Sequence, residues 1–63
     1  MANNKEIAMF HKEHLFSLLA TKFLIGNIPK EIEQLIAIQI TKMDIEDVAY
    51  VREQVELLYG NKN

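Results

Sequence analysis

One break divides this chain of 63 residues. The residues that interrupt regular structure cluster only in the run Gly26-Asn27-Ile28-Pro29. Gly and Asn tolerate positive φ and end helices, whereas Pro is favoured in the first turn of a new helix. The whole chain holds two Gly and one Pro, so long uninterrupted elements are expected on either side of the break. A chain this short has room for one domain, which we place at residues 1–63.

The segment before the break predicts a helix over residues 4–25, because it lacks Gly and Pro and is rich in Leu, Ala, Phe and Lys. Asn3 or Asn4 is expected to cap it. Its apolar residues form two sets on different sides of the helix. The main stripe is Ala8, Leu15, Phe16, Leu19, Ala20 and Phe23, and the second set is Ile7, Phe10, Leu18, Leu24 and Ile25. Two apolar faces are more than a small three-helix monomer covers, so we expect a homodimer that forms through this helix.

The segment after the break predicts a helix over residues 29–43. Helical spacing relates its apolar residues Ile32, Leu35, Ile36, Ile40 and Met43, with Gln39 on the same side. A strand is the alternative for residues 36–41, because Ile36, Ile38 and Ile40 alternate there with other residues. A lone strand has no evident pairing partner within the chain, so helix is the preferred interpretation. A strand could still form by pairing across a dimer.

A third helix is predicted over residues 45–59. Asp44 is a natural N-cap, and Asp47 three residues later makes a weak capping box. Four residues at three- and four-residue spacing form the seam expected of coiled-coil-like packing: Val48, Val51, Val55 and Leu58. Gly60 and Asn61 are expected to end the helix. The fold class is therefore all-α, a small three-helix bundle or helical hairpin, and we expect it to be dimeric because so small a domain is marginally stable.

Composition excludes several classes of protein. The chain has no Cys, so disulfide scaffolds and thiol nucleophiles are ruled out, and its formal net charge of −2 is not that of a typical nucleic-acid binder. The most apolar run, residues 15–25, is about half of the ~20 residues that a membrane span requires. We expect no membrane segment and no secretory signal, and hence a cytoplasmic protein. The excess of Lys over Arg is typical of a low-GC bacterium or one of its phages.

The only chemically suggestive cluster contains His11 and His14, which are three residues apart and therefore share a helix face. Two imidazoles do not make a metal site, and no carboxylate is evident as a third ligand, so we expect no metal and no cofactor. A dimer could supply four imidazoles, so a metal-dependent assembly through His11 and His14 is a further alternative. Ser17 is the only serine and follows His14 by three residues. A chain of this size rarely encloses the pocket that a nucleophile needs, so we expect no catalytic residues and no enzyme.

The surplus of apolar surface favours a protein-interaction module. We predict a non-enzymatic regulator or inhibitor, bacterial or encoded by a phage, that blocks a larger and unidentified protein partner. A helix face would dock in an apolar groove of that partner, and acidic residues of the third helix would steer the approach. The predicted partner-binding residues are Phe10, Leu18, Tyr50, Glu53, Leu57 and Tyr59.

The alternative function is a helical DNA-binding repressor. The junction Met43-Asp44-Ile45 resembles the turn of a helix-turn-helix, and the helix after it would then read bases. That helix carries Glu46, Asp47, Glu53 and Glu56, with Arg52 as its only cation. Such a surface repels phosphate, so nucleic acid is not expected as a partner.

Overall fold

The computed structural model describes residues 4–60, and these residues form helices without any strand. The elements are α1 (Asn4–Ile25), α2 (Lys30–Thr41), α3 (Ile45–Val55) and a π-helical turn, η1 (Glu56–Gly60), which continues α3. The expected all-α class is confirmed for the described residues. The strand alternative for residues 36–41 is wrong, because this segment belongs to α2.

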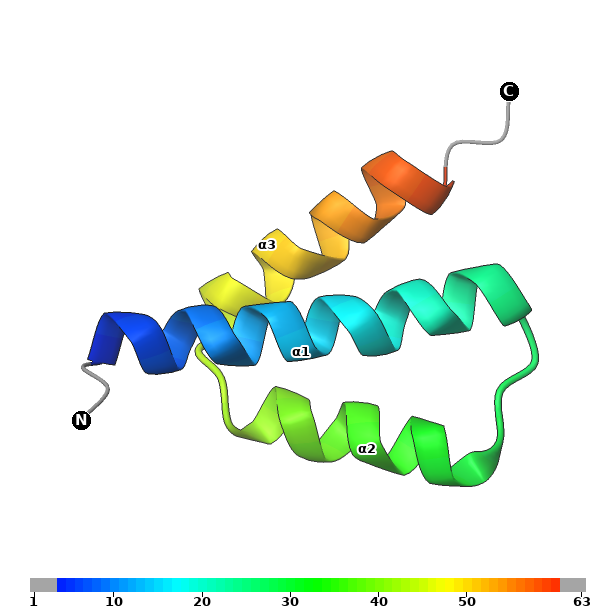
Figure 1. Ribbon diagram of the computed structural model, residues 1–63, viewed down its shortest axis with the longest axis horizontal. Helices are drawn as coiled ribbons and strands as arrows, with labels where there is room; N and C mark the ends of the chain where they lie inside the picture. Colours follow the sequence, from blue (N-terminus) through cyan, green and yellow to red (C-terminus); the bar gives the residue numbers. More distant parts are fainter. Residues whose placement is uncertain (1–3, 61–63) are drawn as a thin grey trace.

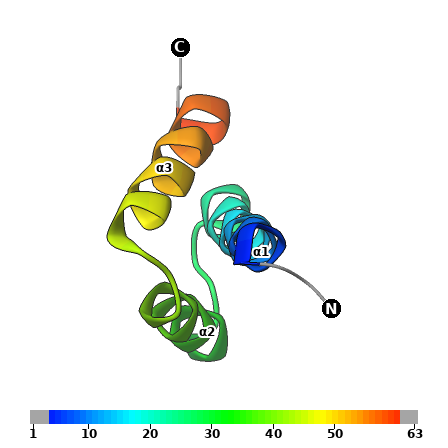
Figure 2. The same cartoon turned by 90° about the vertical axis from the view of Figure 1, so that its left-hand side faces the viewer.

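Helix α1 is the common packing partner of the other elements. Figure 1 shows α2 running antiparallel to α1 and α3 turning back to cross α1 obliquely. The view along α1 in Figure 2 places α2 and α3 on neighbouring sides of α1, which leaves its remaining sides uncovered. α1 packs against α2, α3 and η1, whereas α2 and α3 barely contact one another. The three helices therefore form an open arrangement, in which α1 keeps an uncovered outer face.

The core lies where α1 meets the other two helices. Its buried cluster consists of Leu15, Ile36, Val48, Val51 and Val55, and around it pack the partly buried Phe16, Leu18, Leu19, Ile28, Ile32, Ile40 and Met43. Leu15 and Val55 are fully buried. Three members of the predicted α3 seam are therefore core residues. The helical period places one residue per turn of α3 against α1, which explains their burial.

Several apolar residues lie elsewhere than predicted. Phe23, expected in the main stripe of α1, and Leu35, expected on the inner side of α2, are both exposed. Leu18, expected in the second set, packs against the core instead. The reason is that α2 and α3 approach α1 from two directions. Leu18 lies seven residues after His11, a residue that contacts α2, so it shares the α2-facing side.

The helices end close to the residues that the sequence indicates, but the predicted capping hydrogen bonds are not all formed. Gly26 ends α1 with φ +86°, and its N–H donates to the Lys22 carbonyl across 2.8 Å. Asp44 occupies the N-cap of α3, yet its side chain makes no capping hydrogen bond, so the predicted capping box with Asp47 is wrong. The Asp44 side chain is exposed, and water can serve as its partner instead. The predicted cap of α1 cannot be compared, because Asn3 and the Asn4 side chain lie outside the described part.

The π-turn changes which residue faces the core at the end of the chain. Its hydrogen bonds join residues five apart instead of four, so each residue advances less around the helix axis. Leu58, predicted as the last residue of the seam, is consequently 65% exposed. Tyr59 is less exposed, at 36%, and its ring lies 6.4 Å from that of Phe16. The predicted place of Leu58 in the core is therefore wrong.

Candidate protein-docking surface

Three of the predicted partner-binding residues lie together on the outer face of α3 and of η1, which continues it. Tyr50, Glu53 and Leu57 are three and four residues apart, and Glu46 precedes Tyr50 by four, so these four residues form one stripe, here called the outer stripe. All four are exposed, with Tyr50 at 55% and Leu57 at 65%. The buried valines of α3 occupy the opposite side. The outer stripe thus presents two apolar side chains and two carboxylates along one helix.

The other three predicted residues are not part of this stripe. Phe10 lies on the outer side of α1 and is 64% exposed. Leu18 is half-buried against the core, and Tyr59 contacts the Phe16 ring. The sequence could not separate these positions, because each of them satisfies the same local pattern of an apolar residue beside polar ones.

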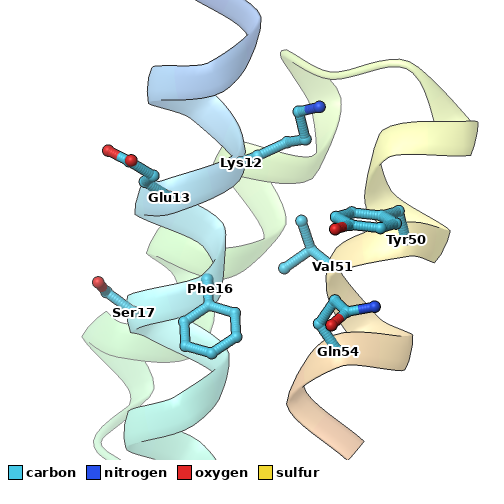
Figure 3. Close-up of a pocket in the computed structure, with 7 residues that line it drawn as sticks. All are labelled: Lys12, Glu13, Phe16, Ser17, Tyr50, Val51 and Gln54. Atoms are coloured by element: carbon cyan, nitrogen blue, oxygen red, sulfur yellow. The ribbon is translucent and has the colours of Figure 1, made fainter. Parts of the chain in front are cut away.

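A groove of about 550 Å³ runs between α1 and α3, and Figure 3 shows it with α2 lying behind the two helices. Phe16 and Val51 line it from opposite sides, and Tyr50 stands at its edge. The Lys12 Nζ lies 5.7 Å from the centroid of the Tyr50 ring, within range of a cation–π interaction. The remaining lining residues are Glu13, Ser17 and Gln54.

No local pattern in the sequence predicts this groove. Phe16 was expected in the core, and Lys12 and Tyr50 come from helices far apart in the chain. Only the crossing of α3 over α1 brings them together.

A shallow hollow adjoins the groove on the outer side of α1. It is lined by Phe10, Glu13, His14 and Ser17, of which Glu13 and Ser17 also line the groove. The Phe10 ring lies 6.2 Å from the His14 ring, in a tilted arrangement. All four side chains of the hollow are exposed. The hollow and the groove therefore form one continuous surface.

His11, the other histidine of the sequence cluster, has a structural contact. Gln39, which is 4% exposed, donates from its Nε2 to the His11 Nδ1 across 2.9 Å. The same amide nitrogen lies 3.4 Å from the His11 carbonyl oxygen. Gln39 is the buried polar side chain of α2, and His11 satisfies it. Among residues 4–60, no group of three or more His, Cys, Asp or Glu side chains is placed to hold a metal ion.

The charges around α3 are unevenly distributed. Glu46, Glu53 and Glu56 are exposed on this helix and its π-turn, and Arg52 is the only Lys or Arg between residues 45 and 60. A negative helix surface attracts basic protein surfaces and repels phosphate.

In the part of the chain that the structure describes, no helix is both long enough and apolar enough to cross a membrane.

Comparisons of this chain with protein-family models, with curated proteins and with solved structures find no significant match.

Proposed function

We propose that this chain is a non-enzymatic protein-interaction module that regulates or inhibits a larger protein by docking the outer stripe of α3 onto it. The observation that carries the proposal is the exposure of Tyr50 and Leu57 on one helix face, where they alternate with the carboxylates of Glu46 and Glu53. Large apolar side chains are usually buried, so two that are exposed on the same helix face are candidate contacts for a partner.

The outer stripe suits a helix-in-groove mode of recognition. Tyr50 of α3 and Leu57 of η1, which continues α3, are seven residues apart, so both can enter one apolar groove. Tyr combines a large apolar area with a hydroxyl that can remain hydrated, which makes it a common anchor residue. Glu46 and Glu53 flank these anchors and would face Lys or Arg on the rim of the partner's groove. Such rim charges increase the association rate more than the affinity.

The test is site-specific photo-crosslinking in cells that express the chain. A photoreactive amino acid at Glu53, in the centre of the outer stripe, is expected to capture one discrete protein in a nuclease-resistant adduct. The same amino acid at Ile38, which is exposed on α2, serves as the matched control and should not capture that protein. An identical pattern of adducts from both positions would contradict the proposal.

Variants then connect the captured protein to the stripe. In a binding titration with the purified partner, Tyr50→Ala and Leu57→Ala should each weaken the affinity at least tenfold, as interface anchors do. Ile38→Ala should leave the affinity unchanged. If the chain instead binds to DNA, and this binding disappears on nuclease treatment and weakens steeply with salt, the chain is a DNA-binding repressor.

A further inference from the structure

The four residues of the hollow on α1 are arranged so that they can pair with themselves. Phe10, Glu13, His14 and Ser17 follow one another at positions i, i+3, i+4 and i+7, and therefore form one stripe along α1. A two-fold axis that passes between Glu13 and His14 would place Phe10 opposite the Ser17 of a second copy, and Glu13 opposite the second copy's His14. In a two-fold interface each contact occurs twice, so a surface must carry both members of every pair.

We infer that a second copy of this chain covers this face, with the two α1 helices packed antiparallel about that axis. The pairing is complementary in size, because the large Phe10 ring meets the small Ser17 side chain. It is complementary in charge, because a Glu carboxylate meets an imidazole that can donate a hydrogen bond or carry a positive charge. It does not require Phe10 to move inward, because this side chain already projects into solvent.

The groove between α1 and α3 provides the space that the incoming ring needs. Ser17 and Glu13 lie both in the hollow and in the groove, so a Phe10 ring placed over the second copy's Ser17 reaches the groove's edge. Phe16 and Tyr50 of that copy offer aromatic surface there. Aromatic rings that meet in offset or tilted arrangements stabilise one another beyond the apolar area they bury.

The balance of buried and exposed apolar groups supports a second copy as the occupant. In the described residues, six hydrophobic residues are buried, whereas thirteen large ones are exposed. The chain has no disulfide, because it has no Cys, and self-association is a common way to stabilise so small a domain.

Sedimentation equilibrium of the purified chain tests the dimer. We expect a mass of twice 7.3 kDa at micromolar concentrations. Phe10→Ala and Ser17→Lys should each raise the dimer Kd at least tenfold, while circular dichroism shows unchanged helix content because both positions are exposed. The matched control Ile38→Ala on α2 should change the Kd less than twofold. A chain that stays monomeric up to millimolar concentration, or a dimer insensitive to both α1 variants, would overturn the inference.

A charge exchange tests the position of the axis. Glu13→His places two imidazoles opposite each other, and His14→Glu places two carboxylates opposite each other, so each should raise the dimer Kd several-fold at neutral pH. The double variant restores an acid opposite an imidazole and should return the Kd to within about threefold of the original, since a pair of contacting groups is not additive. Additive losses in the double variant would exclude this axis.

Disulfide cross-linking tests the antiparallel direction. The chain has no Cys of its own, so Phe10→Cys and Ser17→Cys each introduce a single thiol. A mixture of the two variants should form a mixed disulfide, because the two positions would lie within the ~7 Å Cα separation that a disulfide tolerates. Phe10→Cys alone should not form one, and efficient cross-linking in that sample would indicate a parallel pair instead. Because these measurements use the purified chain alone, their outcome is independent of the proposed role of the outer stripe.

Discussion

Gln39 of α2 reaches the His11 ring of α1 and donates a hydrogen bond from its Nε2 to the ring Nδ1 across 2.9 Å. This contact joins residues 28 positions apart and satisfies a side chain that is almost fully buried. The amide nitrogen can only donate, so the Nδ1 is the acceptor in this contact. We interpret this hydrogen-bonded pair as a polar contact that stabilises the packing of α1 against α2.

The first prediction concerns this hydrogen-bonded pair. His11→Ala should lower the free energy of unfolding by about 1–3 kcal/mol, because it leaves the buried Gln39 amide without its side-chain partner. Gln39→Leu in addition should recover part of the loss, because it removes the unsatisfied amide. Urea denaturation measures both values, with the exposed Gln34→Ala as the control. If the two single losses simply add in the double variant, the two side chains do not act as a pair.

The second prediction separates the two glycines. Gly26 has φ +86°, and no atom lies near the position of an added Cβ, so Gly26→Ala should lower the free energy of unfolding by about 1–2 kcal/mol through backbone strain alone. Gly60 has no positive φ, and an added Cβ would make ordinary contacts of 3.5 Å with Glu56 and Phe23. Gly60→Ala should therefore raise the free energy of unfolding by about 0.4–1 kcal/mol. Thermal denaturation of both variants checks the opposite signs, and shifts in the same direction would refute the prediction.

The third prediction uses two isoleucines of α2. Ile36→Ala should cost about 2–5 kcal/mol of folding free energy, because Ile36 belongs to the buried cluster. Ile38→Ala should change it by no more than about 0.5 kcal/mol, because Ile38 is exposed. A strand would place both residues on one face, and similar losses in the two variants would therefore favour a strand over α2. Urea denaturation at a fixed protein concentration distinguishes these outcomes.

The fourth prediction tests the π-turn. Tyr59→Ala should lower the free energy of unfolding by at least about 1 kcal/mol, because it removes the contact with the Phe16 ring. Leu58→Ala should change it by no more than about 0.5 kcal/mol, since this side chain is largely in solvent. A regular α-helix would continue the valine seam to Leu58. A loss of several kcal/mol in Leu58→Ala, with little effect in Tyr59→Ala, would therefore show that the last turn is α-helical.

The residues of α3 show where helical spacing predicts burial and where it stops doing so. Val48, Val51 and Val55 could be predicted as core residues from their spacing, because a regular helix repeats every 3.6 residues and one side must be buried. Leu58 continues the same spacing but leaves the core, since the last turn is no longer a regular α-helix. The helical spacing therefore no longer predicts burial where the helix geometry changes. No residue type in that turn indicates the change from α-helix to π-helix.

The candidate surfaces were only partly predictable for a related reason. Tyr50, Glu53 and Leu57 share a face by helical spacing alone, so a list drawn from the sequence could include all three. Phe10 is exposed as that list requires, but Leu18 packs against the core and the Tyr59 ring contacts Phe16, a residue distant in the chain. The groove depends on how α3 crosses α1, and a single helix pattern contains no information about that crossing.

The sequence by itself determined the all-helical class, the break at Gly26 and the valine side of α3, because these depend on backbone propensities and on a fixed helical period. Only the tertiary structure decided which residues meet: Gln39 with His11, Lys12 with Tyr50, and Phe16 with Tyr59. Those contacts depend on the angles and offsets between helices, which result from packing all side chains together in three dimensions.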